Sequence, residues 1–331
     1  MSNSVADVYA RCTDDPLGHG PETTVFDAIH AKISPRSEVL RLLPHRERRM
    51  VGAWCFVDLY GPRPITGDGD AMHVAPHPHT GLQTVSWLVA GEVTHRDSLG
   101  TTAQVVPGRV AVMTAGDGIA HAEDVVAQSE GVLHGAQLWI ALPEAERHRE
   151  RAFVLHEPAP YLEADGVLAR VFVGALGGVT ADEQGFSRLV GAELTPHGGG
   201  AGQVPLEPAY EHILVPLAGS ATVDGVTVEH GQAMYLGTSR SALELTLSPD
   251  ARVLLLGGEP FAEEIVMWWN FVARTHDEID RARAQWNAGG DLRFGEVEHY
   301  PTDERLAAPP LPNVRLQPRG RVSARPPRSD S

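Results

Sequence analysis

The sequence predicts an all-β protein made of two tandem β-barrels, with one short helix near the C-terminus. Glycine (34 residues) and proline (25 residues) are spread through the 331-residue chain and separate short apolar runs, as expected of many strands joined by turns. A weak internal repeat supports two copies of one β-domain, because each copy reads strand, Gly, strand, Gly, strand, Gly. A chain of this length suits two domains of roughly 130 residues each plus extensions.

The predicted strands are short and evenly spaced, which suits compact antiparallel barrels. They are Met50–Leu59, Gln83–Val89, Arg109–Met113, Ala136–Leu142, Val167–Val173, Ile213–Leu217, Ala233–Leu236 and Leu243–Leu247. The repeat relates Thr84–Gly116 to His212–Gly237 and places the join between Leu142 and Pro160. The predicted divisions are a flexible extension (1–24), a first barrel (25–150), a second barrel (151–300) and a Pro/Arg-rich tail (301–331).

One helix is predicted after the second barrel. Thr275 and Glu278 form a T-x-x-E capping box, and Gly289 with Gly290 ends the pattern. Apolar residues follow the box at helical spacing: Ile279, Ala282 and Trp286.

Both ends of the chain have compositions that predict little structure. After Tyr300 the chain is rich in Pro and Arg, which cannot build a core, and about the first 20 residues read similarly. The alternative is that the basic tail folds back onto the acidic body.

Charge and composition exclude several classes of function. A net charge of −16 repels nucleic-acid phosphates and anionic lipids alike, so we expect no direct nucleic-acid binding. No apolar run approaches the length of about 18 residues that spans a bilayer, so no membrane contact is expected. Cys12 and Cys55 are too few for a disulfide framework, and no secretory signal opens the chain, so a cytoplasmic location is expected.

Two short motifs carry candidate metal ligands. His77 and His79 are two residues apart on a segment that enters a strand, and side chains at this spacing lie on the same strand face. His121 and Glu123 have the same i, i+2 spacing about 40 residues later. One H-x-H pair among 16 histidines is often incidental, but the matching H-x-E in the equivalent place of a second strand predicts a metal site.

The predicted donor set restricts the metal. Three neutral imidazoles and one carboxylate suit Fe, Mn, Ni, Cu or Zn rather than Ca or Mg. Four protein ligands on an octahedral ion leave two positions for a substrate oxygen and dioxygen, which is compatible with catalysis as well as with sensing or storage.

At these motifs the sequence resembles the pirins, a branch of the cupin superfamily. The resemblance rests on HPHTGLQTVSWLVAGEVTHRDSLG (His77–Gly100), MTAGDGIAHAE (Met113–Glu123) and LHGAQLWIALP (Leu133–Pro143), and it runs from about Phe26 to Tyr300. It implies two tandem cupin, jelly-roll-like barrels, with one metal, most often iron(II), in the first. The implied ligands are His77, His79, His121 and Glu123.

The second barrel is expected to hold no metal. Its equivalent segment AYEHILVPLAG contains only His212, which we interpret as a satisfied histidine. In the first barrel, Gln83 stands where cupins commonly have Glu. Because an amide cannot serve as a general base, Glu123 is the nearest candidate catalytic base.

Other residues of the first barrel have two interpretations. His95 and Asp97 either stabilise a hairpin or approach the metal and orient its ligands. His134 either orients a ligand or is a buried structural histidine. Cys55 is expected to be an inert buried thiol.

Several aromatic residues either pack in the core or wall a pocket for a flat substrate: Trp54, Phe56, Trp87 and Trp139. The segment Met267–Ala273 is expected to pack the last helix onto the barrels.

Two functions remain open at this point. The resemblance implies a quercetin 2,3-dioxygenase-type enzyme, in which a flavonol loses a proton to Glu123 or solvent, reacts with dioxygen and opens with release of carbon monoxide. The alternative is an iron-dependent redox sensor that binds a protein partner and regulates transcription or metabolism. A cupin that acts on an unrelated small metabolite is a third possibility.

Overall fold

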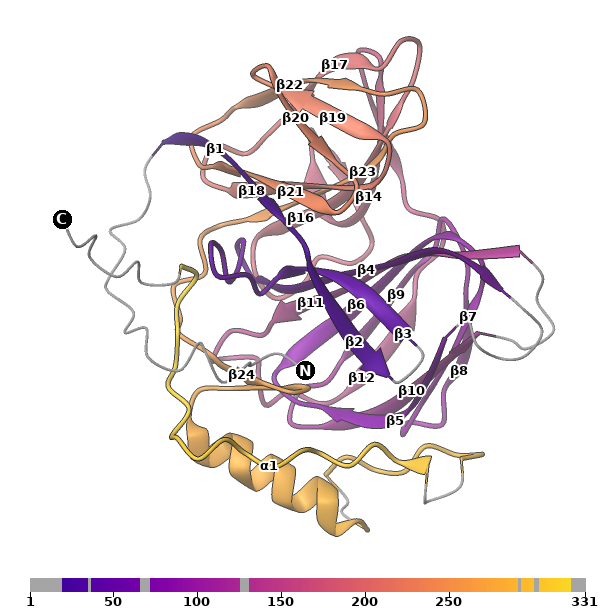
Figure 1. Ribbon diagram of the computed structural model, residues 1–331, viewed down its shortest axis with the longest axis vertical. Coiled ribbons are helices and arrows are strands. Elements are labelled where there is room, and N and C mark those ends of the chain that lie inside the picture. The colour runs from indigo at the N-terminus through magenta and orange to yellow at the C-terminus, as the bar shows by residue number, and fades with distance from the viewer. Residues whose placement is uncertain are drawn as a thin grey trace.

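The computed structural model describes residues 20–34, 37–65, 72–125, 131–290, 293–300 and 304–322. Two β-barrels stack along the long axis of the molecule, and one helix lies beyond the first barrel (Figure 1). All the pairings between strands in these residues are antiparallel. The predicted all-β fold with two barrels and a short C-terminal helix is confirmed.

The first barrel packs a seven-stranded sheet, in the order β12-β9-β6-β11-β4-β3-β2, against a four-stranded sheet, in the order β5-β10-β7-β8. Its strands are β2 (Ile29–Ser34), β3 (Ser37–Leu43), β4 (Trp54–Ile65), β5 (His73–His79), β6 (Leu82–Ala90), β7 (Val93–Asp97), β8 (Thr102–Val105), β9 (Val110–Thr114), β10 (Ile119–Val125), β11 (Gly131–Ala141) and β12 (Ala152–Leu155). The cavity described below lies between these sheets.

The second barrel repeats this arrangement with an eight-stranded and a four-stranded sheet, the latter in the order β17-β22-β19-β20. Its strands are β13 (Tyr161–Ala164), β14 (Val167–Leu176), β15 (Val179–Thr180), β16 (Leu189–Pro196), β17 (Ala201–Pro205), β18 (Glu211–Ala218), β19 (Ser220–Val223), β20 (Val226–Glu229), β21 (Gln232–Gly237), β22 (Ala242–Leu247) and β23 (Arg252–Gly258).

The N-terminal strand β1 (Pro21–Asp27) belongs to the second barrel, although it precedes the first in sequence. It pairs with β21, and in Figure 1 the indigo strand lies beside the orange ones. Residues 21–24 are therefore part of a sheet and not of a loose extension. The predicted boundaries near residues 150 and 300 stay predictions.

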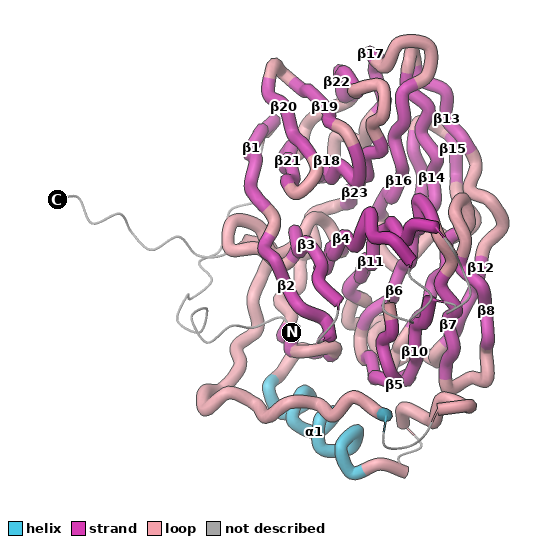
Figure 2. The backbone as a smooth tube through the Cα atoms, turned by 45° about the vertical axis from the view of Figure 1, so that its right-hand side comes forward, coloured by secondary structure: helices cyan, strands magenta, loops and turns pink. Residues whose placement is uncertain are grey.

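The chain returns from the second barrel to the first through a small hairpin of β24 (Val266–Trp268) and β25 (Phe271–Ala273), followed by α1 (His276–Ala288). Thr275 and Glu278 form the predicted capping box, Gly289 caps the C-terminal end, and α1 buries its three predicted apolar residues. Figure 2 shows this helix in cyan, at the end of the molecule away from the second barrel.

The hairpin and helix share an apolar cluster with Ala120 and Ala122 of β10, so the expectation that Met267–Ala273 packs the helix onto the barrels is confirmed. No helix among the described residues is long and apolar enough to cross a membrane.

Part of the Pro/Arg-rich tail folds back onto the body. The indole N–H of Trp286 donates to the Leu306 carbonyl (2.8 Å), and Arg321 Nη1 lies 2.6 Å from Glu211 Oε2. The expectation of an unstructured tail is therefore wrong for residues 304–322, where a buried carboxylate and helix side chains supply the contacts that the composition cannot. Residues 1–19 and 323–331, with Cys12 among them, lie outside the described residues.

One continuous apolar core joins the two barrels. The Trp54 indole N–H donates to the carbonyls of Val190 (3.1 Å) and Gly257 (3.2 Å), while Trp87 stacks on Phe172 with centroids 4.6 Å apart. Trp54 and Trp87 thus occupy the interface between the barrels, which confirms the core interpretation for these two residues.

Candidate metal centre

The first barrel encloses a cavity of about 100 Å³ lined by the predicted ligands His77, His79, His121 and Glu123. Aromatic side chains form another part of the wall: Phe56, Trp139 and Trp269. Phe56 and Trp139 stack with centroids 3.9 Å apart. The pocket interpretation therefore applies to Phe56 and Trp139, which line the cavity, and not to Trp54 and Trp87.

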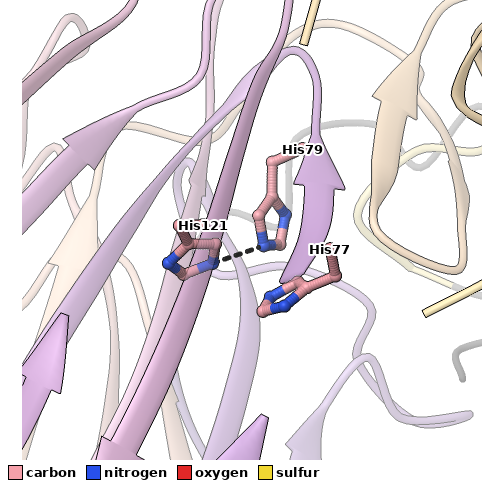
Figure 3. A group of neighbouring side chains, drawn as sticks. All are labelled: His77, His79 and His121. Carbon is pink, nitrogen blue, oxygen red and sulfur yellow. Dashed lines mark hydrogen bonds between the residues drawn. The ribbon is translucent and has the colours of Figure 1, made fainter. Parts of the chain in front are cut away.

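Three histidines converge because two strands pair in a fixed register. His77 and His79 lie on β5, which pairs antiparallel with β10 so that His121 faces His77. All three side chains are buried, and one nitrogen from each lies within 4.8 Å of the others. Figure 3 shows the three rings turned toward one another.

Hydrogen bonds at Nδ1 fix which nitrogen of each ring is free. His77 Nδ1 lies 2.9 Å from the Ala75 carbonyl, and His79 Nδ1 lies 3.1 Å from the Asn270 carbonyl. A carbonyl only accepts, so both rings carry their proton on Nδ1 when neutral. Each Nε2 then has a bare lone pair, which is the form that binds a metal.

His121 brings a third nitrogen to the group. Its Nε2 lies 3.1 Å from Nε2 of His79, as the dashed line in Figure 3 marks. Two ring nitrogens at this distance share a proton, or can bind one cation when both are deprotonated. The donor set therefore fits a divalent ion bound by imidazole.

Burial keeps all three rings neutral near pH 7. It lowers the pKa of His77 to about 4, against an ordinary value of 6.5. Burial and then the charges of neighbouring histidines hold the pKa values of His79 and His121 well below the usual range. Neutral imidazole is the protonation state required of a ligand.

Glu123 lines the same cavity but belongs to a different group of possible metal ligands. Its carboxylate falls within 4.8 Å of His121 and His95, which makes a second group of possible ligands with His121 common to both. Ser86 Oγ donates to Glu123 Oε1 at 3.3 Å. Burial raises the pKa of Glu123, although the charge of His95 and the Ser86 hydrogen bond oppose the shift.

His95 and Asp97 combine the two roles considered for them. Asp97 Oδ1 accepts from the backbone N–H groups of Leu99 (2.8 Å) and Thr101 (3.1 Å), which stabilises the β7–β8 turn. Asp97 Oδ2 lies 3.0 Å from His95 Nε2, and His95 Nδ1 lies 3.3 Å from His121 Nδ1. The pair therefore supports the hairpin and also contacts a predicted ligand.

Two other polar residues lie away from the cavity wall. His134 Nε2 lies 3.0 Å from the Leu217 carbonyl of the second barrel, so it is a buried structural histidine and orients no ligand. Gln83 is buried and donates to Thr114 Oγ1 at 3.1 Å. Its amide is not among the groups that line the cavity.

Cys55 behaves as the sequence predicts. It is fully buried, and burial raises its thiol pKa to about 12, which makes it inert.

The second barrel shows no comparable cluster of ligands among the residues that the structure describes. His212, however, is not the satisfied histidine that we expected. It is 1% exposed, and neither ring nitrogen has a hydrogen-bond partner in the described residues.

One wall of the cavity is formed by residues that could not be predicted from the sequence. Trp269, Asn270 and Leu306 come from the hairpin and tail that follow the second barrel. The Asn270 contribution to His79 is a backbone carbonyl, which has no side-chain signature. Only the tertiary fold brings these residues to the site.

Comparisons with known proteins agree with this architecture. The pirin profile matches residues 36–140, and the profile of the pirin C-terminal cupin domain matches residues 192–295. A Caulobacter vibrioides pirin-like protein is 36% identical over 283 residues, 83% of this chain and 96% of the relative. A Pseudomonas aeruginosa protein provisionally named quercetin 2,3-dioxygenase is 46% identical over 299 residues, 90% of this chain and 94% of the relative.

Solved structures show the same fold. A crystal structure titled quercetin 2,3-dioxygenase from Acinetobacter baumannii has a TM-score of 0.84 at 39% identity, covering 89% of this chain and 97% of the other. A bacterial pirin from Escherichia coli matches with a TM-score of 0.56 at 18% identity, over 72% of this chain and all (100%) of the other. The chain therefore belongs to the pirin family of two-domain cupins.

Proposed function

We propose that this chain binds one divalent transition metal, with iron(II) preferred, through His77, His79, His121 and Glu123. The observation that carries the proposal is the set of three buried imidazoles with convergent nitrogens, two of which bring their Nε2 atoms to 3.1 Å. Imidazole also suits Mn, Ni, Cu and Zn, so the preference for iron rests on the family resemblance.

Glu123 would complete the donor set by turning from Ser86 toward the histidines. It contributes the one negative charge of the set, and it is the carboxylate of the two motifs that lines the cavity. Its raised pKa also suits it to accept a proton from a bound hydroxyl group.

We further propose a quercetin 2,3-dioxygenase-type activity on a flavonol or another small aromatic compound. The names of the Pseudomonas and Acinetobacter relatives support this reaction class. The ion, when bound, supplies a Lewis-acid template and an electron conduit for dioxygen. The stacked pair of Phe56 and Trp139 would hold the aromatic ring, and Glu123 would take the hydroxyl proton.

A buried ion pair adds polarity to the same wall. Arg41 Nε lies 2.8 Å from Asp58 Oδ1, Arg41 Nη2 lies 2.6 Å from Asp58 Oδ2, and both residues line the cavity. The guanidinium also lies 4.5 Å from the Phe56 ring centroid. This pair would orient oxygen substituents of a phenolic ring.

The size of the cavity sets a condition on the substrate. Pockets for drug-sized molecules typically measure about 300–1,000 Å³, whereas this cavity measures about 100 Å³. A flavonol would therefore enter only if part of the wall moves. The wall formed by Trp269 and Leu306 belongs to the hairpin and tail, which pack on the barrel from outside.

The test combines metal analysis with oxygen uptake. Protein made without a metal-binding tag should contain about one transition metal per chain, and the iron-loaded form should consume oxygen with quercetin or a smaller phenol. His79→Ala should abolish both. Full iron occupancy without oxygen consumption on the whole panel would contradict the enzymatic proposal and favour the redox-sensor alternative.

A further inference from the structure

The chain Asp97–His95–His121 connects a buried carboxylate to a predicted metal ligand through two consecutive imidazoles. All three side chains are buried, with exposed fractions of 1%, 3% and 1%. The connecting distances are 3.0 Å from Asp97 Oδ2 to His95 Nε2 and 3.3 Å from His95 Nδ1 to His121 Nδ1.

Hydrogen bonding gives this chain a direction. An ionised carboxylate only accepts, so His95 with one ring proton carries it on Nε2. Its Nδ1 is then bare and can only accept, so His121 must carry its proton on Nδ1. That leaves the lone pair of His121 Nε2 free, next to Nε2 of His79.

We propose that Asp97 and His95 are positioning residues that hold His121 in its metal-binding tautomer. The inference rests on the proposed metal site and deepens it. Backbone carbonyls fix the Nδ1 proton of His77 and of His79, whereas Nδ1 of His121 has no carbonyl partner in the described residues and lies beside His95 instead. A carboxylate or carbonyl behind a ligating imidazole is the usual way to fix its tautomer. Here the carboxylate acts one imidazole further away.

The second oxygen of Asp97 makes a sharp test possible. Its Oδ1 accepts from two backbone N–H groups of the turn, which cannot reverse their polarity. In Asp97→Asn the amide oxygen must therefore keep the turn, and the NH₂ group must face His95. This single-atom change replaces an acceptor by a donor at the start of the chain and keeps the shape of the side chain.

The reversal should propagate to the metal ligand. His95 would accept from Asn at Nε2 and carry its proton on Nδ1, which then faces His121. His121 would accept at Nδ1 and hold its proton on Nε2, where it can donate to His79 Nε2. The ligand nitrogen would be blocked by a proton that a metal has to displace.

The experiment measures Zn²⁺ affinity by competition with a chromogenic chelator, and ¹⁵N chemical shifts of the imidazoles in metal-free protein. Asp97→Asn should weaken Zn²⁺ binding by about 10–100-fold, the usual effect of losing such a partner. In this variant the ¹⁵N chemical shifts of His121 should show its proton on Nε2, whereas in the wild type they should show it on Nδ1. A merely structural role for Asp97 would leave the tautomer of His121 unchanged.

Two further variants test the hydrogen-bonded chain and the β7–β8 turn separately. Gly100→Ala strains this turn at a positive φ of 82° and keeps both N–H groups that bind the Asp97 side chain, so it should lower the melting temperature and leave Zn²⁺ affinity within about twofold. His95→Leu interrupts the chain, so adding Asp97→Asn to it should cause no further loss of affinity.

Equal Zn²⁺ affinity and an unchanged His121 tautomer in folded Asp97→Asn would overturn the proposal. So would a further loss of affinity when Asp97→Asn is added to His95→Leu. Failure of the wild-type protein to bind Zn²⁺ or iron would instead contradict the proposed metal site itself.

Discussion

Replacing His212 by leucine should stabilise the protein and flatten the acid side of its stability profile. His212 lies near the start of β18 and is 1% exposed, and neither ring nitrogen has a partner in the described residues. Leaving a buried polar group unsatisfied costs about 1–3 kcal/mol. An apolar side chain of similar size should recover about this much in the free energy of unfolding near pH 7.

The acid dependence follows from the pKa of His212. Burial, with a smaller effect from the charge of Arg240, lowers this pKa from 6.5 to about 4. In that interval the unfolded chain binds a proton at His212 that the folded chain does not, so stability falls as the pH falls from 6.5 toward 4. The wild type should therefore lose about 2.5 kcal/mol from this residue by pH 4.5, and His212→Leu should lose none of it.

The assay is urea unfolding at several pH values between 4.5 and 7.5, with chelator present so that metal binding does not contribute. The other buried histidines remain in both proteins, so the difference between wild type and variant isolates His212. His30→Leu, at an exposed position of β2, serves as the control for the effect of introducing a leucine at a histidine. Parallel curves for wild type and His212→Leu would refute the reasoning and indicate that water satisfies the ring.

Three further predictions concern stability and reactivity. Glu211→Ala should destabilise the protein by about 3–5 kcal/mol in denaturant unfolding, because it leaves the guanidinium of Arg321, whose side chain is 10% exposed, without its carboxylate. Glu259→Ala at an exposed pair should cost less than about 1 kcal/mol. Zn²⁺ at about 100 times its Kd should stabilise the wild type by about 2.7 kcal/mol and His79→Ala much less, as calorimetry in the presence and absence of chelator can check. Cys55 should resist iodoacetamide in the folded protein and react only after unfolding, as peptide mass spectrometry can show; alkylation under native conditions would contradict its burial.

The sequence was sufficient to predict features that depend on local spacing. The i and i+2 spacing of the two motifs predicts that each pair shares a strand face, and antiparallel pairing of β5 with β10 brings His77 opposite His121. The T-x-x-E box and the glycines fix the limits of α1 in the same way. The contacts within each motif and within the capping box are readable because their residues lie within a few positions of one another, whereas the pairing of β5 with β10 comes from the fold.

Features that depend on long-range contacts could not be read from the sequence. The pairing of β1 with the second barrel requires an open edge on β21, and no residue pattern in Pro21–Asp27 indicates that partner. The Asn270 carbonyl reaches His79 over 191 positions in the chain. Likewise, the sequence places His95 in a hairpin but does not show that its Nδ1 lies beside Nδ1 of His121.

The second barrel bears on the candidate metal centre through its packing against the first barrel and through the chain that follows it. The core that joins the barrels contains Trp54 and Phe172, and Glu211 of β18 accepts from the Gly52 N–H of the first barrel at 2.6 Å. Beyond β23 the chain continues into the hairpin that carries Asn270. Because that carbonyl sets the proton position on His79, the placement of the hairpin bears directly on the ligand geometry. We therefore expect substitutions that loosen the packing of the second barrel against the first to weaken metal binding as well.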